Sequence, residues 1–365
     1  VIKTFTGTGL VKRMFATGVT PVTLDSLTSG FNIAKNLSLD ERFNDMMGFT
    51  EAEVAELLEY YEIPNTDVVL KDMRSYYNGS CFSREGVNKL YNSNMVLYFL
   101  DEIYARGKYP HSLIDVNIAS DYGKIANIFA LKQDSETDET IKQIIANGET
   151  TATLTEQFSF QKDFTNDDLV SLLYYNGLLT IKGEHLGRIV FCMPNYVIKE
   201  LYWKFISDRL QKRNKLKINT SQLQTAIEQM AIEGKIDLYM ELINTTMKQL
   251  SNRDLMNFDE KYIKMLFVAF ATLSPIYLKK SEYEVGKKYP DLIFLSTPMV
   301  PVVNQMLFEF KYLKVSESHK LEETIAEATA QVQKYLEIEE IKQIKNLHSY
   351  VVVFVGEVGH WSEVN

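Results

Sequence analysis

Three charged residues in the last quarter of the chain have types and spacing that could perform chemistry together. Asp291 follows Pro290, and Glu309 and Lys311 lie on either side of Phe310. Side chains alternate along a strand, so Glu309 and Lys311 would share one face of it. If this strand pairs as a hairpin with the strand that Asp291 begins, the two carboxylates approach each other. Such carboxylates repel unless a cation lies between them, and oxygen ligands favour Mg²⁺ or Mn²⁺.

This grouping predicts metal-assisted hydrolysis of a phosphodiester. Asp291 and Glu309 would hold the metal, and Lys311 would position or activate a water and offset charge on the phosphate. Glu284 is a candidate for a third carboxylate at the metal. The alternative is that these are solvated charges on two strand ends, with Glu284 one more acid on the surface.

Gln331 and Tyr335 are further candidates for the site. They are four residues apart on a predicted helix and therefore share a face of it. Tyr335 could equally be a packing residue between helix and sheet, beside Val332 and Leu336.

The elements that would position these residues form a small α/β sheet. Helices precede two strands, at 289–295 and 305–312, which are followed by an amphipathic helix at 321–338 and an apolar strand at 350–355. This α-β-β-α-β order predicts a buried final strand.

The preceding residues are mainly helical in pattern. Thr50 and Glu53 form a predicted capping box. The other expected elements are a loop at 76–80, helices at 92–104, 167–175 and 197–210, a surface excursion at 133–140, and a hairpin that turns at 182–184. The polar, basic stretch 212–220 is the expected domain boundary.

The C-terminal motifs, Pro290-Asp291, Glu309-Phe310-Lys311 and the QxxxY of Gln331–Tyr335, resemble those of the PD-(D/E)XK nuclease superfamily, and the QxxxY resembles its RecB-like branch. The resemblance implies a restriction-endonuclease-like core. It also implies that Asp291 and Glu309 bind metal, that Lys311 is catalytic, that Glu284 completes the site, and that Gln331 and Tyr335 organise the site and the DNA.

The first two thirds resemble the AAA-ATPase-like family, whose members commonly end in such a nuclease domain. The resemblance rests on short motifs in a specific order, which are FATGVTP (15–21), SGFNI (29–33), GFTE (48–51), YNG (77–79), LLYYNG (172–177) and Pro194-Asn195. It implies a remnant of the ATPase core at 1–40, a helical lid or winged-helix-like region at 41–214, and a nuclease-like domain at 215–365. The ATPase part would also be the site of any homo-oligomer.

One element of that family is missing, because the sequence contains no GxxxxGK[ST] phosphate-binding loop. The chain begins at Val1, and the family places this loop upstream of TGVTP. We therefore expect ATP to be a cofactor only of a longer form. Thr17 could face a γ-phosphate, although a turn-capping role is the favoured interpretation.

Composition limits the remaining choices. The net charge of −9 argues against a protein that simply coats nucleic acid, so a nucleic-acid partner, with DNA favoured, needs a local groove or a metal. No apolar run is long enough to span a bilayer, the opening residues do not form a signal peptide, and the two cysteines form no CxxC, so we expect a cytoplasmic protein without a membrane partner.

Two rival functions stay open at the level of sequence. In one, the chain is a catalytically silent interaction or regulatory protein that keeps the nuclease fold as a scaffold, and the excess of acidic residues favours it. In the other, the protein is an ATPase or signalling switch whose nuclease part is accessory.

The missing phosphate loop gives the first prediction. The isolated chain should hydrolyse no measurable ATP in a phosphate-release assay, because nucleotide binding lacks its main contact. Turnover that disappears on Thr17→Ala would contradict this prediction.

Overall fold

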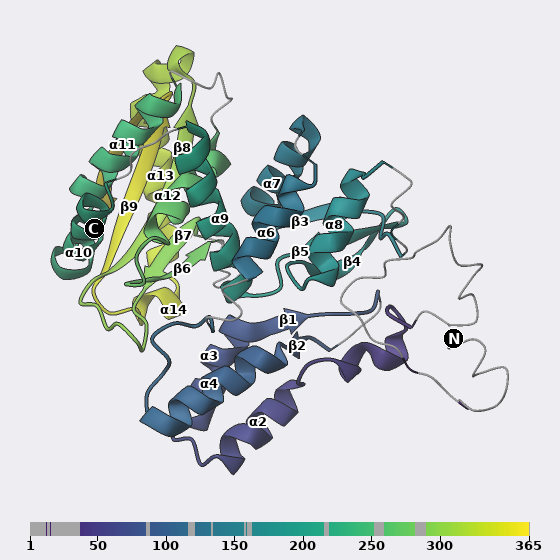
Figure 1. The fold of residues 1–365 in the computed structure, drawn as a ribbon. Coiled ribbons are helices and arrows are strands. Elements are labelled where there is room, and N and C mark those ends of the chain that lie inside the picture. Colours follow the sequence, from purple (N-terminus) through teal and green to yellow (C-terminus); the bar gives the residue numbers. More distant parts are fainter. Residues whose placement is uncertain are drawn as a thin grey trace. The chain divides into compact units, whose positions relative to one another are not determined.

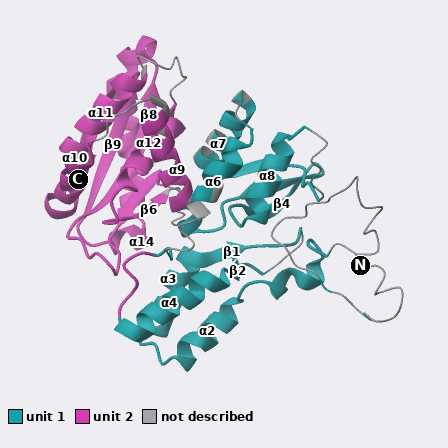
Figure 2. Cartoon of the chain, viewed as in Figure 1, with its two compact units in different colours: residues 1–107, 113–199 teal, residues 108–112, 200–365 magenta. Residues whose placement is uncertain are grey.

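The computed structural model describes residues 12, 15, 37–84, 88–115, 121–132, 134–156, 158, 163–214, 219–251, 259–281 and 290–364. The chain forms two compact units (Figure 2). The first comprises residues 1–107 and 113–199, and the second comprises residues 108–112 and 200–365. We describe each unit by itself, and most of the expected ATPase remnant at 1–40, including Thr17, lies outside the described residues.

The second unit is built on a five-stranded mixed sheet with the order β10-β9-β8-β7-β6 (Figure 1). Its strands are β6 (Leu278–Ser281), β7 (Leu292–Leu295), β8 (Gln305–Leu313), β9 (Leu347–Val355) and β10 (Val358–Val364). Its helices are most of α9 (Tyr196–Asn214), then α10 (Thr220–Glu233), α11 (Asp237–Ser251), α12 (Glu260–Ala271), η2 (Val315–Lys320), α13 (Leu321–Leu336) and α14 (Glu339–Lys342). The expected mixture of helices with a C-terminal α/β sheet is confirmed.

The strand pairings follow from the connections between them. β6–β7, β7–β8 and β9–β10 are antiparallel, whereas β8 and β9 are parallel. Parallel neighbours need a long crossover, and η2, α13 and α14 supply it. β9 is buried along most of its length, as its continuous apolar sequence predicts.

Alternation along the strands gives the sheet two different apolar faces. On one face, Leu307 and Val351 pack in a cluster with Val332 of α13. On the other face, Phe308 and Phe310 contact the ring of Phe267 on α12, with centroids 4.9 and 5.1 Å away. Glu309 and Lys311 alternate with these phenylalanines, so they belong to the face that α13 covers.

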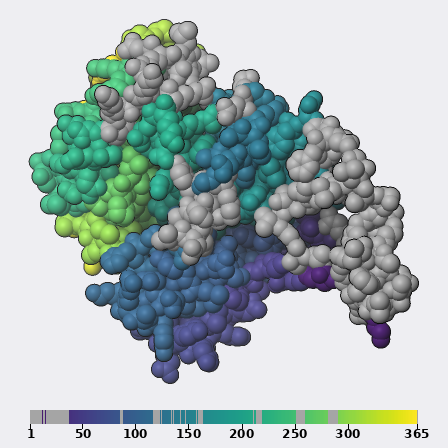
Figure 3. All heavy atoms as spheres, in the orientation of Figure 1, coloured from purple at the N-terminus to yellow at the C-terminus, as the bar shows by residue number. Residues whose placement is uncertain are grey.

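The first unit begins with a group of helices and a short hairpin. Its elements are η1 (Glu41–Met46), α2 (Glu51–Tyr60), α3 (Thr66–Tyr77), β1 (Asn78–Ser80), β2 (Leu90–Tyr91) and α4 (Ser93–Arg106). The capping box predicted at Thr50 and Glu53 is confirmed. The purple-to-blue atoms of these elements form one closely packed mass (Figure 3).

The rest of the first unit combines three helices with a three-stranded sheet of order β3-β5-β4. The elements are α6 (Asp121–Ala130), α7 (Ser135–Asn147), β3 (Glu149–Ala152), α8 (Asn166–Tyr175), β4 (Thr180–His185) and β5 (Arg188–Cys192). Thr165 and Asp168 cap α8 reciprocally. No helix among the described residues has both the length and the apolar character needed to cross a membrane.

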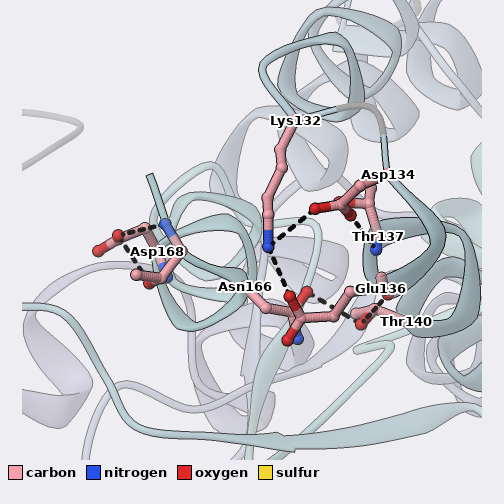
Figure 4. Close-up of polar contacts among 8 residues, drawn as sticks. Lys132, Asp134, Glu136, Thr137, Thr140, Asn166 and Asp168 are labelled. Atoms are coloured by element: carbon pink, nitrogen blue, oxygen red, sulfur yellow. Dashed lines mark hydrogen bonds and ion pairs between the residues drawn. The ribbon is translucent and has the colours of Figure 1, made fainter. Parts of the chain in front are cut away.

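The stretch 133–140 is not the surface excursion that its polarity indicated, because most of it forms the start of α7 (Figure 4). Asp134 accepts a hydrogen bond from the Thr137 amide at 2.8 Å, and Lys132 bridges to Glu136 at 2.6 Å. Thr140 donates to Asn166 at the start of α8, at 2.9 Å. The acidic residues therefore stabilise a helix N-terminus, where negative charge is favourable.

Two further local predictions are wrong. Tyr76 and Tyr77 end α3, and Asn78–Ser80 form β1 instead of a loop. The hairpin turns at Leu186 and Gly187, both with positive φ, and not at 182–184, where the ladder contains a register shift. A glycine with polar neighbours is typical both of an irregularity within a strand and of a turn. The predicted turn was therefore placed at the irregularity.

The aromatic face of the second unit gives a stability prediction. Phe267→Ala should lower the free energy of unfolding by about 3–5 kcal/mol, because it removes a buried ring that contacts four others. Both tryptophans of the chain, Trp203 and Trp361, lie in this unit, so their fluorescence in a urea titration reports its unfolding. Lys261→Ala on the exposed side of α12 is the control, and an equal loss in both variants would contradict the prediction.

Candidate active site

The β7–β8 hairpin brings Asp291 next to Glu309. Leu292 pairs with Phe308, so continuing the register by one residue places Asp291 opposite Glu309. Asp291 lies just before β7 instead of inside a strand that begins at 289, since Pro290 has no N–H to donate to a ladder. The Asp291 carboxylate accepts a hydrogen bond from the Phe310 amide at 2.9 Å, which continues the pairing through a side chain.

Lys311 lies beside Glu309 on the same face of β8, as the alternation predicted. Its Nζ is 2.6 Å from Oε1 of Glu309. The Glu309 side chain is only 2% exposed, whereas that of Lys311 is 27% exposed. Oε2 of Glu309 is buried and has no hydrogen-bond partner among the residues that the structure describes. A buried carboxylate oxygen without a partner is costly, and a bound cation would satisfy it.

The electrostatics of Glu309 reflect this arrangement. Burial raises the pKa of Glu309 to about 7, the neighbouring Asp291 adds to the rise, and Lys311 opposes it. Burial also acts to lower the pKa of Lys311, but the hydrogen bond to Glu309 and the surrounding carboxylates outweigh it, so that pKa is raised. Lys311 is therefore a cation at neutral pH, and a positive ligand near Asp291 and Glu309 would favour the ionised Glu309.

Glu260 is a fourth charged residue near Asp291, Glu309 and Lys311, and the sequence alone did not identify it. It is the first residue of α12, where Asp259 caps the helix. Burial raises the pKa of Glu260, and the charges of Lys311, Asp291 and Lys264 also act on it. The available signal was an acid in the first turn of an apolar helix, which normally indicates only a helix start.

Gln331 and Tyr335 contact each other on α13, with Nε2 of Gln331 donating to the Tyr335 hydroxyl at 2.6 Å. Tyr335 is buried. Burial raises the pKa of Tyr335, Gln331 lowers it, and the charges of Glu309, Asp291 and Lys311 also act on it. The tyrosine is thus both a packing residue of α13 and a neighbour of the charged group, so the two sequence interpretations are compatible.

The chemistry of the donor set fits a small divalent cation. Glu284 lies outside the described residues, and no cluster of three His, Cys, Asp or Glu side chains with metal-binding geometry is found among the residues that are described. Mg²⁺ commonly uses only one or two protein carboxylates and completes its shell with waters and substrate phosphates. Asp291 and Glu309, whose Oε2 no described residue hydrogen-bonds, match that requirement.

Comparison with known families agrees with the sequence motifs at the C-terminus. The family model of the PD-(D/E)XK nuclease superfamily matches residues 258–363, which span the chain from the start of α12 to β10. All four charged residues described above lie within the match. No curated protein matches the chain. The matched domain supports a nuclease, and with it nucleic-acid binding, for this part of the chain.

The raised pKa of Glu309 gives a prediction on stability. Because the folded-state pKa of about 7 exceeds the ordinary 4.5, the folded chain keeps an extra proton between these values. Stability therefore falls as pH rises through this window, by on the order of 3 kcal/mol in total. Glu309→Gln, which resembles the protonated form, should be more stable than wild type at pH 8, and the difference should shrink towards pH 5.

The measurement is tryptophan fluorescence during urea unfolding, in EDTA, at pH 5 and pH 8. Glu322→Gln on an exposed part of α13 is the control and should follow wild type. A stability difference for Glu309→Gln that is the same at both pH values would show that the carboxylate does not titrate as described.

Proposed function

We propose that the chain is a metal-dependent nuclease that hydrolyses phosphodiester bonds, with DNA as the favoured substrate. The observation that carries the proposal is the buried Glu309 carboxylate, which lies opposite Asp291 and beside Lys311. One of its oxygens has no hydrogen-bond partner in the part of the chain that the structure describes. These residues fall inside the match to the PD-(D/E)XK nuclease superfamily.

Asp291 and Glu309 would hold Mg²⁺ or Mn²⁺, with Glu260 close enough to act on them by charge. The bound ion would supply a polarised water and offset negative charge on the phosphate. The Phe310 amide orients Asp291, and the Lys311 bond to Oε1 of Glu309 leaves Oε2 available. Glu284 stays a candidate for a further ligand.

Lys311 is proposed as the catalytic cation. Its pKa is raised, so it holds its proton and does not act as a base at neutral pH. From its partly exposed position it would orient the attacking water and stabilise charge that develops on the phosphate oxygens. Tyr335, fixed by Gln331, would position the site or the substrate strand.

We assign α12, β7, β8, α13 and β9 to the α-β-β-α-β core of a restriction-endonuclease-like fold, with β6 and β10 as additional edge strands. The Gln331–Tyr335 pair supports the RecB-like branch. In this proposal the nuclease-like domain is 215–365.

We propose further that the first two thirds belong to an AAA-type ATPase, with its remnant at 1–40 and a lid with a winged-helix-like part at 41–214. The three-stranded sheet in which β5 lies between β3 and β4, with α8 before the hairpin, supports the winged helix. ATP and any homo-oligomer would belong to the ATPase part. Cys81 and Cys192 form no disulfide with each other, which supports a cytoplasmic location.

The alternative is a catalytically silent scaffold for interaction or regulation. The net charge of −9 favours it, because nothing in the bulk charge attracts nucleic acid. The two proposals differ in whether any metal and substrate give cleavage.

The test is cleavage of single-stranded and duplex DNA by the full chain. Activity should require Mg²⁺ or Mn²⁺ and disappear in EDTA. Lys311→Ala and Glu309→Ala should each reduce the rate at least about 100-fold, because both groups act on charge at the phosphate. Gln331→Ala and Tyr335→Phe should lose roughly tenfold or less, since a single supporting hydrogen bond contributes about 1 kcal/mol.

Exposed residues of the same charge provide matched controls. Lys342→Ala and Glu322→Ala should retain wild-type rates. Cleavage that survives both Lys311→Ala and Glu309→Ala would place the chemistry elsewhere, and no cleavage with any metal or substrate would favour the scaffold.

A further inference from the structure

Lys264 is a second partly buried lysine beside the carboxylates, and the proposed chemistry gives it no role. It lies on α12, one helical turn after Glu260, so the two residues share a face of the helix. The turn is held in place by Asp259, which accepts from the Tyr262 amide at 2.7 Å, and by the buried residue Ile263.

Nζ of Lys264 lies 3.6 Å from Oδ1 of Asp291, and the two side chains are only 13% and 17% exposed. Ion pairs this shielded from water are screened by salt much less than surface pairs. The separation exceeds hydrogen-bonding distance, and the Phe310 amide binds the other oxygen, Oδ2. Oδ1 therefore faces a cation but keeps its lone pairs for a ligand.

The net charge of the groups around Asp291 and Glu309 indicates which ligands the site can hold together. With all groups ionised, three carboxylates (Glu260, Asp291 and Glu309) face two ammonium groups (Lys264 and Lys311), which leaves one net negative charge. Asp259, which also acts on Glu260, is left out of this sum because it is exposed and caps α12. A divalent cation would make the site singly positive, and a phosphodiester, which carries one negative charge, would then make it neutral. Without Lys264, the same complex would be left with an uncompensated negative charge in a poorly hydrated site.

We propose that Lys264 is a positioning residue that holds Asp291 and sets the balance between the two ligands, weakening binding of the metal while strengthening binding of the phosphodiester. This inference rests on the proposed nuclease function. Its physical basis is that one ammonium group repels the cation and attracts the phosphate, so its removal changes the two affinities in opposite directions.

The test compares Lys264→Met with Lys261→Met, which removes the same charge from an exposed position on the same helix. Mn²⁺ binding to the full chain is measured by calorimetry at pH 8, where Glu309 is mostly ionised. Binding of a short DNA duplex is measured by fluorescence anisotropy in Ca²⁺. Lys264→Met should bind Mn²⁺ roughly three- to tenfold more tightly and DNA roughly three- to tenfold more weakly.

The conservative variant Lys264→Arg keeps the charge, so both of its affinities should stay within about twofold of wild type. If Lys264→Met does not fold, Lys264→Gln, which also removes the charge, takes its place with the same two expected changes in affinity. Weaker binding of both ligands by Lys264→Met would indicate a merely structural role, and affinities equal to those of Lys261→Met would show no role; either result overturns the inference. Wild-type chain that binds no Mn²⁺ would instead overturn the proposed function on which the inference rests.

Discussion

The constraint on which the candidate site depends is a carboxylate buried in the middle of an apolar sheet. Glu309 lies between Phe308 and Phe310 on the central strand β8, and its side chain is almost inaccessible to solvent. Burial of a charge costs several kcal/mol unless it is compensated. Lys311 compensates the charge at Oε1 of Glu309 only. The rest of the site must therefore accommodate the buried Oε2.

The packing of the sheet holds Glu309 in this unfavourable buried position. β8 is held between β7 and β9, and its phenylalanines pack against Phe267 of α12 on the far face. A shift of register by one residue would exchange Glu309 for an apolar side chain on the α13 face and lose both cores. The apolar packing therefore offsets the unfavourable burial of the Glu309 carboxylate, and a bound divalent cation would reduce that cost. Functional sites commonly contain such unfavourable groups, which the rest of the fold stabilises.

The charge of the site is related to the acidic composition of the whole chain. A protein with a net charge of −9 has no general attraction for nucleic acid, so any recognition of a phosphodiester must come from a few placed cations. Lys264 and Lys311 lie beside the carboxylates, each close enough to an acid to be oriented by it. The site is thus organised around balanced charges, and its affinity for an anion would depend on the metal.

The sequence by itself determined those relations between site residues that depend only on periodicity and chain order. Alternation placed Glu309 and Lys311 on one face, and the four-residue spacing placed Gln331 beside Tyr335, because both relations are local. It did not determine that Glu260 lies near Asp291, or that one oxygen of Glu309 has no hydrogen-bond partner within the described ranges. The first depends on how α12 packs against the sheet, and the second depends on the burial of Glu309. Only the tertiary structure determines these two features.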